Sequence, residues 1–465
     1  MVNKRVAKKL NKLAGEISEL RLSNFRIFWK TKIREQRVKL LLKDFRILRE
    51  QGLGDTEFLY WLRFIERVRS AHKGDANAMN YLKGLPKGTV TKLNDYIETL
   101  TNVTLPAFSR PKVGILAKPS EDGRLYGESN NFYKSLVEVG HDLGLCVFTF
   151  GESDVNFEKK SLDANFIITS GSGKKLWVRR KVSFPKVVYD RATGIPSTFR
   201  TKLEKAGMIL VNPPELIGLA GDKWQSYSVL NRAGITATSE TKQAETMLYS
   251  LPNLKTMIAK HSVVFLKPRR GSQGIGIMSL SKTQDGYLLK PNNQKFKSSQ
   301  LNSISQFVSG NYIVQQGIAV TKYNNAVFDI RVLIQKNNRG KLRLTGMVAR
   351  VSTPGQITSN LHTGGSNQRV SKVLNNLFGA SAFRSEFKKK IENASFKTFH
   401  AIEDHLRKKL CEIAIDIMVD TKGDLYIIEI NSKPGRASFR FLGDDFRTNA
   451  VRRPMEFTSY LLNNT

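Results

Sequence analysis

Cysteine is almost absent from the 465-residue sequence, which holds only Cys146 and Cys411. The two residues lie far apart and in no metal-ligand spacing, so the sequence excludes a disulfide framework and a structural zinc site and favours the reducing cytoplasm. Long apolar runs are also missing, because no stretch reaches the eighteen or so residues that a spanning helix needs. The basic N-terminus contains no apolar segment of the kind that a secretory signal carries. We therefore expect a cytoplasmic protein without a transmembrane segment.

Acidic residues are few beside the basic ones: 75 lysines and arginines stand against 40 aspartates and glutamates, a formal net charge of +35. A chain with this excess attracts polyanions through long-range electrostatics. The candidate partners are nucleic acid, an anionic membrane or cell-wall surface, and acidic peptides or sugars. Charge does not choose among them, and a solvated basic surface that serves solubility is an equally good interpretation.

The basic excess is concentrated at the N-terminus, where residues 1–50 contain 15 lysines and arginines and 5 acidic residues. Apolar residues recur there at a spacing of four and three, the pattern of a helical hairpin or a short coiled coil. They are Val6, Leu10, Leu13, Ile17 and Leu20. We interpret residues 1–106 as a basic helical region that binds a partner or a polyanionic surface. A helical cap packed on the body of the protein is the alternative.

From residue 107 the pattern changes to alternating strands and helices. Strands over 113–117 and 145–150 flank a helix over 129–140, which predicts a βαβ-like unit in a domain that spans 107–219. No G-x-G-x-x-G motif follows the first strand, so a dinucleotide site is not supported there. We also expect short strands within 162–190 and a polar loop over 291–303.

Two elements of the C-terminal half suit a phosphate chain. Asp222 can cap a helix whose first turn carries Lys223, and an apolar strand ends at Lys267 before a glycine-rich hairpin loop. Glycines let backbone N–H groups approach phosphate oxygens, and the lysines supply point charges. No G-K-[ST] closes the loop, so it is not a Walker A loop. The loop residues that we assign to the nucleotide are Gly271, Ser272, Gly274 and Gly276.

A third element, over residues 311–318, is an apolar strand that becomes polar after Val314. A polar break of this kind can present backbone groups to an adenine edge while an apolar side chain lies against the base. The predicted adenine residues are Gln315, Gln316, Gly317 and Ile318.

A fourth element places Asp329 and Arg331 on one face of a strand, because they are two residues apart. The carboxylate is either an ion-pair partner of the arginine or a ribose acceptor beside an anion clamp. Arg350 follows, and then a polar segment over 359–365 that is suited to wrapping a substrate. Within that segment His362 is interpreted as a polar loop residue rather than as a base.

The fifth element is a carboxylate cluster on two strands. Glu429 and Asn431 are two apart on one strand, and Asp416 lies on the preceding strand of a hairpin, opposite them. Carboxylate and amide oxygens that converge on one point suit Mg²⁺, which also takes phosphate oxygens. Carboxylates in strands this apolar are costly without a cation, which favours a metal site over a purely structural one.

This ordered set of elements resembles the ATP-grasp superfamily, which includes glutathione synthetase and the ribosomal-protein glutamate ligases. Residues 111–440 look closest to the YheC/YheD family, called endospore coat-associated in Gram-positive spore formers. The matching segments are VVYDR (187–191), GDKW (221–224), FLKPRRGSQGIGI (265–277), YIVQQGI (312–318), FDIRVLI (328–334), SNLHTGG (359–365) and IDI with IIEINSKPG (415–417 and 427–435). Many relatives carry an acidic residue near the start of the adenine hinge, where this chain has Gln315 and Gln316. Because a glutamine can still hydrogen-bond adenine, this departure weakens base selectivity more than ATP binding.

The resemblance implies an α+β ATP-grasp domain over 220–465, whose two α+β lobes, 220–318 and 319–465, clamp ATP. A βαβ pre-ATP-grasp domain and the helical N-terminal appendage precede it. The resemblance implies phosphate contacts for Lys223 and Lys267, and Arg331, Arg350 and Asn360 near the γ-phosphate and the acceptor. It further implies that Asp416, Glu429 and Asn431 ligate Mg²⁺, with two ions expected.

The leading functional hypothesis is a carboxylate–amine ligase that uses ATP and Mg²⁺ and acts through an acyl phosphate. Its substrate would be an acidic peptide, an amino acid or a cell-envelope precursor, in keeping with the basic charge. A phosphotransferase on the same scaffold and a non-catalytic spore-coat or scaffold protein are the alternatives. The resemblance adds an association with the spore or cell envelope to the expected location, and nucleic acid stays a candidate partner.

Overall fold

The computed structural model divides the chain into two compact units, Met1–Ile209 and Leu210–Thr465, and each is considered by itself. Most of the predicted N-terminal helical region lies outside the described residues, which include one helix there, α5 (Ala76–Lys83). Among the helices of the described residues, none combines the length and the apolar character needed to cross a membrane. The structure describes Tyr60, Arg63, Phe64, Glu66, Arg67, Ser70 and residues 75–83, 110–120, 125–169, 175–236, 238–271, 274–291, 294–308, 310–353 and 365–464.

The first unit is built on a sheet with a parallel centre. Strand β1 (Lys112–Leu116) pairs in parallel with β2 (Cys146–Phe150) and with β6 (Val187–Asp190). Helix α7 (Asn130–Asp142) connects β1 and β2 and buries Leu136 and Val137, so the predicted strand–helix–strand unit is confirmed. The sheet order is β3 (Val155–Asn156), β4 (Ser161–Thr169), β2, β1, β6, β7 (Ile209–Val211), with β5 (Lys175–Ser183) paired to β4. The remaining elements are α8 (Ser197–Lys205), η2 (Gly127–Ser129) and η3 (Glu152–Asp154).

The strands predicted within 162–190 are present, and the last of them, β6, is short as expected, but the first two are longer than predicted. Strands β4 and β5 are nine residues each and pair along their whole length as one antiparallel hairpin. Leu162 and the four consecutive residues 164–167 of β4 are buried, including the polar Asn165. Polar residues within β4 made the strand look shorter in the sequence, because only packing against the rest of the sheet decides which of them are covered.

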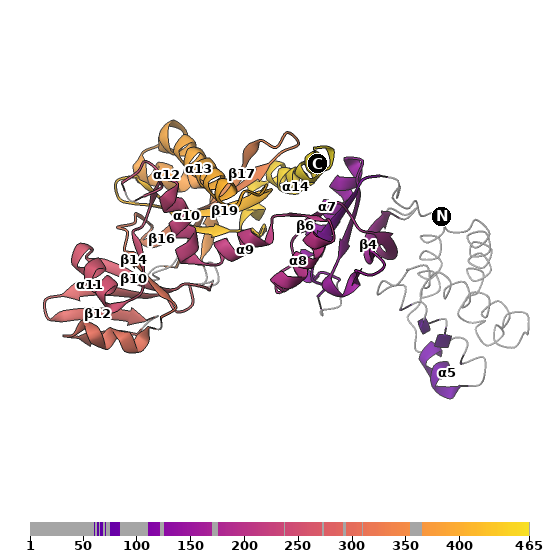
Figure 1. The fold of residues 1–465 in the computed structure, drawn as a ribbon, viewed down its shortest axis with the longest axis horizontal. Coiled ribbons are helices and arrows are strands. Elements are labelled where there is room, and N and C mark those ends of the chain that lie inside the picture. The colour runs from indigo at the N-terminus through magenta and orange to yellow at the C-terminus, as the bar shows by residue number, and fades with distance from the viewer. Residues whose placement is uncertain are drawn as a thin grey trace, which may run out of the picture. The chain divides into compact units, whose positions relative to one another are not determined.

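Two sheets lie in the described residues of the second unit: a smaller antiparallel one, and a larger one that is antiparallel except for the parallel pairing of β20 (Leu425–Asn431) with the edge strand β8 (Lys242–Gln243). The order of the smaller sheet is β13 (Phe296–Ser298), β12 (Gly286–Pro291), β11 (Met278–Thr283), β10 (Val263–Pro268), β14 (Tyr312–Gln316), β9 (Thr246–Leu248). Helix α11 (Leu251–Lys260) packs against this sheet, with β14, β10 and β11 as its neighbours (Figure 1). The polar loop predicted over 291–303 was wrong in part, because β13 and the start of η4 (Leu301–Phe307) lie there.

Strand β10 shows how this sheet presents polar groups. Val264 and Leu266 point to the core with Leu254 and Met257 of α11, so the alternate residues Phe265 and Lys267 face the other way. The opposite face of the same strand therefore carries the lysine that the sequence singled out.

The larger sheet of the second unit carries the remaining candidate residues. Its order is β18 (Ser366–Gln368), β17 (Leu342–Val351), β16 (Ala326–Lys336), β19 (Glu412–Val419), β20 (Leu425–Asn431), β8 (Lys242–Gln243), with β15 (Lys322–Tyr323) paired to β16. The helices of this part are α9 (Pro214–Ala220), α10 (Lys223–Arg232), α12 (Val370–Phe378), the π-helical turn η6 (Phe383–Phe387), α13 (Lys388–Leu406), η7 (Ala437–Leu442) and α14 (Asp444–Asn463).

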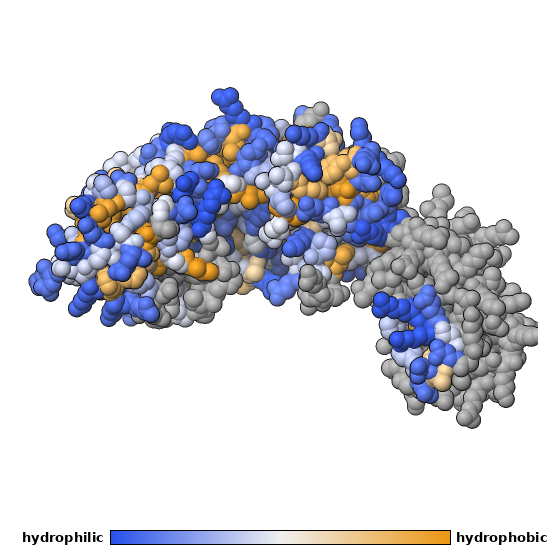
Figure 2. Space-filling view, turned by 60° about the horizontal axis from the view of Figure 1, so that its bottom comes forward, coloured by the Kyte–Doolittle hydropathy of each residue, from blue (hydrophilic) through white to orange (hydrophobic). Residues whose placement is uncertain are grey.

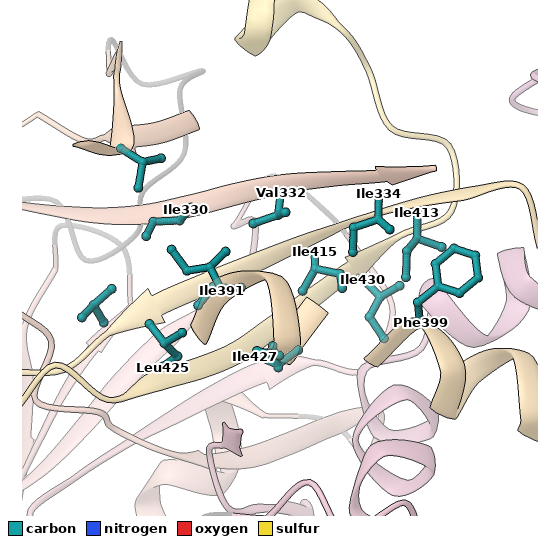
Figure 3. Close-up of a cluster of buried hydrophobic side chains, with 14 of the residues drawn as sticks. Ile330, Val332, Ile334, Ile391, Phe399, Ile413, Ile415, Leu425, Ile427 and Ile430 are labelled. Atoms are coloured by element: carbon teal, nitrogen blue, oxygen red, sulfur yellow. The ribbon is translucent and has the colours of Figure 1, made fainter. Parts of the chain in front are cut away.

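One face of this sheet is apolar and packs beneath α13. Figure 3 shows Ile330, Val332 and Ile334 of β16 in one cluster with Ile391 and Phe399 of α13. Each such side chain contributes roughly 1.5–3 kcal/mol when it is fully buried. Because side chains alternate along a strand, this burial turns Asp329 and Arg331 to the opposite face, as the sequence predicted.

Strand β20 departs from simple alternation. Leu425, Ile427 and Ile430 all lie in the apolar cluster, although Ile427 and Ile430 are three residues apart. The pairing register between β19 and β20 shifts at this point, as in a β-bulge. The irregularity turns Glu429 and Asn431 away from the core and towards the polar face.

Candidate functional site

A pocket of about 630 Å³ in the second unit is lined by residues of both of its sheets and of helix α10. Of the predicted site residues, thirteen line it: Lys223, Lys267, Gly271, Gly274, Gln315, Gln316, Ile318, Asp329, Arg331, Arg350, Asp416, Glu429 and Asn431. Ser272 and Asn360 lie outside the described residues, as does His362. The structure therefore brings together five segments that are separated by up to about two hundred residues of sequence.

Gly276 and Gly317 are not among the lining residues, and each has a conformational reason to be glycine. Gly276 has a φ of +75°, in the left-handed region that favours glycine. At Gly317 a Cβ atom would lie 2.7 Å from the carbonyl oxygen of Val263, so a side chain would separate β10 from the end of β14. Both glycines are therefore explained by backbone geometry, without a direct contact with the pocket.

Helix α10 begins at the base of the glycine-rich loop. The Asp222 carboxylate accepts hydrogen bonds from the N–H groups of Trp224 and Gln225, which confirms it as the N-cap. Arg269 also donates to both Asp222 oxygens, at 3.0 and 2.8 Å. Burial would raise the pKa of Asp222, but the hydrogen bonds from Arg269 and the Gln225 N–H and the charges of Arg269 and Arg270 together lower that pKa. Lys223 Nζ donates to the carbonyl of Gly271 at 2.9 Å, so Asp222 and Lys223 tie the helix to the loop at two points.

One end of the pocket combines an aromatic ring, a lysine and an amide. Lys267 Nζ donates to Gln315 Oε1 at 2.6 Å and lies 5.4 Å from the centre of the Phe265 ring. Burial, and then the positive charge of Lys223, lower the pKa of Lys267 to about 8. A weakly solvated lysine of this kind gains most from an anionic partner, because the partner replaces the lost hydration.

The residues predicted to bind adenine already make hydrogen bonds to other parts of the protein. The N–H groups of Gln316 and Gly317 donate to the carbonyls of Glu245 and Val263, both at 2.8 Å. The Gln316 side chain accepts from the Glu245 N–H at 3.1 Å. These two N–H groups already have hydrogen-bond partners within the protein, so they are not free to donate to an adenine base.

Two arginines and two aspartates form a connected network across the larger sheet. Arg350 donates to both oxygens of Asp329, at 2.7 and 2.5 Å, and to Asp416 at 2.7 Å. Arg331 donates to both oxygens of Asp416, each at 2.8 Å. Burial would lower the pKa of Arg350, but Asp416 and Asp329 raise it; burial would raise the pKa of Asp416, but Arg331 and Arg350 lower it. The shifts favour the charged forms of Arg350 and Asp416. Asp329 pairs with Arg350 of the next strand, so the ribose role weighed for Asp329 loses support.

Glu429 and Asn431 complete the polar face. Glu429 lies opposite Asp416 in the strand pairing, and burial, followed by the charge of Asp416, raises its pKa. Asn431 Nδ2 is buried and has no hydrogen-bond partner among the described residues. No group of three His, Cys, Asp or Glu residues in the described part of the chain could hold a metal. Two carboxylates and one amide instead fit Mg²⁺ that arrives with phosphate oxygens, because this ion needs few protein ligands.

Sequence reasoning missed most of the apolar lining of the pocket and the polar lining residues Lys322 and Asn325. Phe265 alternates with Lys267, so its place was recoverable from the strand period. Lys322 and Asn325 belong to the hairpin of β15 and β16, whose two-residue turn is formed by Asn324 and Asn325, both with positive φ. The Asn-Asn pair is a recognisable turn signal, although it does not reveal which cavity the turn faces. The other missed residues include Tyr227, Leu230, Ile275, Ile277, Val320, Val327, Met418 and Ile428.

The chain is an ATP-grasp protein, since residues 218–461, more than half of its length, match the family model described as YheC/D like ATP-grasp. It belongs to that family, which confirms the resemblance and the predicted fold class. The boundaries of the predicted domains and lobes, and the pre-ATP-grasp assignment, stay predictions.

Two curated proteins of Bacillus subtilis (strain 168) are similar to the chain. The endospore coat-associated protein YheD is 26% identical over 352 residues, covering 73% of this chain and 75% of that protein. The endospore coat-associated protein YheC is 24% identical over 354 residues, covering 71% and 92%. Among solved structures, D-alanyl-alanine synthetase A from Vibrio cholerae matches with a TM-score of 0.46 and 15% identity, over 76% of this chain and 99% of that one.

Proposed function

We propose that the chain is an ATP- and Mg²⁺-dependent carboxylate–amine ligase that acts through an acyl phosphate. The observation that carries the proposal is the pocket itself, where three lysines, two arginines and three carboxylates meet beside an apolar end. Family membership supports the use of ATP. The acidic peptide, amino acid or cell-envelope precursor proposed as substrate rests on the basic charge of the chain.

In this proposal the triphosphate lies between the lysines and the arginines. Lys223 and Lys267 bind phosphate oxygens, and the backbone at Gly271 and Gly274 approaches them closely. The base lies against Phe265 and Ile318 at the end marked by Gln315. Asp416, Glu429 and Asn431 would hold Mg²⁺, which would supply positive charge to neutralise the phosphates; two ions are proposed.

The reaction is proposed to have two steps. A substrate carboxylate oxygen attacks the γ-phosphorus, the bond to the β-phosphate oxygen breaks, and ADP leaves. Arg331 and Arg350 stabilise the charge that spreads over the transferred group. An amine then attacks the acyl carbon, phosphate leaves with its electron pair, and the amine loses a proton, which gives an amide. Asn360 is proposed to lie near this acceptor.

The test follows ADP release and product mass together. The protein is incubated with ATP, Mg²⁺, acidic peptides or amino acids, and amine donors, and the products are weighed by mass spectrometry. We expect ADP together with an amide, whose mass is that of acid plus amine less one water. Glu429→Ala should abolish both, whereas Glu386→Ala, which removes an exposed carboxylate in an i,i+4 pair with Lys390, should not.

Other outcomes assign other functions. A gain of one phosphoryl group by the acceptor would identify a phosphotransferase. Absence of Mg²⁺-dependent nucleotide binding in the wild-type protein would contradict the proposal and leave a non-catalytic role.

Residues 1–106 are proposed to anchor the protein to a polyanionic surface at the spore or cell envelope, and the names of the two relatives support that location. Deletion of residues 1–106 should then abolish sedimentation with a polyanion while ATP turnover continues. Unchanged sedimentation would contradict the anchoring role.

A further inference from the structure

A chain of hydrogen bonds runs from the pocket into the small sheet. Lys267 Nζ donates to Gln315 Oε1 at 2.6 Å, and Gln315 Nε2 donates to Thr246 Oγ1 at 3.0 Å. The Thr246 hydroxyl then donates to the carbonyl of Ala244 at 2.9 Å. Gln315 and Thr246 face each other directly across β14 and β9. Thr246 is buried, with 3% of its surface exposed.

The direction of every bond in this chain is fixed. A lysine ammonium has donors and no acceptor, so the Gln315 atom that faces it must be the carbonyl oxygen Oε1. A threonine hydroxyl has one proton, and that proton goes to Ala244. Thr246 Oγ1 can therefore only accept, which again requires the NH₂ group of Gln315 on that side. The amide consequently presents an acceptor, and not a donor, at the pocket end beside Lys267.

The Gln315 amide has two hydrogen-bond partners, Lys267 and Thr246, and we expect only the second to be kept when a nucleotide binds. Lys267 also belongs to the proposed phosphate-binding groups, so phosphate oxygens compete with Gln315 for its protons. The hydrogen bond between Gln315 and Thr246 does not involve a proposed phosphate-binding group. The proton of the Thr246 hydroxyl is used by the carbonyl of Ala244, so the hydroxyl oxygen continues to accept from Gln315. When a nucleotide draws Lys267 towards the phosphates, Thr246 alone keeps the amide from rotating.

We propose that Thr246 is a positioning residue that makes this pocket select a purine with an amino group at C6 over one with a carbonyl group there. The inference rests on the proposed nucleotide site. An amino group at C6 donates to Gln315 Oε1, whereas a 6-oxo group would set two acceptors against each other and leave a buried polar group unpaired. The chain thereby recovers, through a neutral glutamine, the acceptor that an acidic residue would supply in any orientation.

The test compares ATP with inosine triphosphate (ITP), which replaces the 6-amino group by a 6-oxo group. Dissociation constants of both are measured by calorimetry for the wild-type protein, Thr246→Val and Thr246→Ser. Valine keeps the volume and removes the hydroxyl, whereas serine keeps the hydroxyl. Thr398→Val is the matched control, because Thr398 is also buried and donates to a backbone carbonyl, that of Ala394, in α13.

We expect the wild-type protein and Thr398→Val to prefer ATP by at least about tenfold. Thr246→Val should reduce the preference to within about threefold, mainly by weakening the binding of ATP. Without the hydroxyl, the Gln315 amide can rotate and turn its NH₂ group towards the base. Thr246→Ser should restore the preference. The double variant Thr246→Val with Gln315→Glu should also restore it, since a carboxylate accepts from both oxygens.

An unchanged ATP-to-ITP ratio in Thr246→Val would overturn the inference, as would equal loss of both affinities without rescue by serine. Equal binding of ATP and ITP by the wild-type protein would overturn it too, while leaving the proposed nucleotide site intact. Failure of the wild-type protein to bind either nucleotide would instead remove the proposed function together with this inference.

Discussion

Arg331 holds the carboxylate of Asp416 with two parallel hydrogen bonds, from Nε to Oδ1 and from Nη2 to Oδ2, each 2.8 Å long. The residues lie on neighbouring strands and directly opposite each other in the pairing. Asp416 is also a proposed Mg²⁺ ligand, so a cation that binds it competes with a guanidinium group. Phosphate oxygens can take over that guanidinium, and this exchange would make nucleotide and metal bind together.

Arg331→Met should therefore separate metal binding from catalysis. Removing the competing charge should tighten Mg²⁺ binding in the absence of nucleotide by about three- to tenfold, while turnover falls by roughly 10²-fold or more. Calorimetric titration with Mg²⁺ and the ADP assay measure the two effects. Arg343→Met, a change of an exposed arginine on β17, is the control and should alter neither. Unchanged Mg²⁺ affinity in Arg331→Met would contradict the competition.

Arg350 should be a structural as well as a functional residue. Arg350→Ala leaves Asp329 and Asp416, which are 4% and 2% exposed, with less compensation, so the free energy of unfolding should fall by about 3–5 kcal/mol. Arg447→Ala breaks an exposed pair with Asp444 and should cost less than about 1 kcal/mol. Urea denaturation of both variants gives the comparison. Equal stabilities would show that the buried network does not hold the sheet together.

Affinity for ATP should depend on pH through Lys267. The pKa of this lysine is lowered to about 8, and the protonated form is the one that binds phosphate. ATP affinity should therefore be constant below about pH 7 and fall as the pH rises through about 8. Dissociation constants between pH 6.5 and 9.5 test this; Lys267→Arg, which stays charged, should flatten the profile. A profile that is flat in the wild-type protein would contradict the assignment.

The free energy of unfolding should depend on the protonation of Lys267 in the opposite direction, rising with pH where ATP affinity falls. The pKa of this lysine is about 8 in the folded chain, against an ordinary value of 10.5. Between about pH 8 and 10.5 the unfolded chain therefore binds more protons than the folded one. The contribution of Lys267 to the free energy of unfolding should consequently rise with pH across that window. Subtracting the pH profile of Lys267→Met from that of the wild-type protein isolates this contribution, and a difference that falls with pH would contradict it.

Asp222 should show two separable roles. Asp222→Asn keeps an oxygen for the helix cap but loses the charge that pairs with Arg269, whereas Asp222→Ala loses both. We expect Asp222→Ala to lower the free energy of unfolding by about 2–4 kcal/mol and Asp222→Asn by roughly half as much. ATP affinity should fall in the same order, because Lys223 follows the cap directly. Identical effects of the two substitutions would assign the whole role to the charge.

The pocket could be located from polar residues that interrupt apolar strands, at Lys267, Asp329, Arg331 and Glu429. Figure 2 shows apolar residues interspersed with hydrophilic ones over the visible face. Charged residues in apolar strands are detectable in the sequence because a strand that is otherwise buried tolerates a charge only where a partner or ligand compensates it.

The sequence by itself determined the family, the strands that carry the site, and the faces on which Asp329 and Arg331 stand. Those properties depend on residue type and on the two-residue period of a strand, which are local. Only the tertiary structure decided the partners: Asp329 pairs with Arg350, Arg331 pairs with Asp416 across 85 residues, and Thr246 orients Gln315 across 69. It also decided, through the irregular pairing of β19 and β20, that Glu429 faces the pocket although Ile427 faces the core. Partner choice and bulges follow from the register between strands, which is fixed by packing on the shared core rather than by neighbours along the chain.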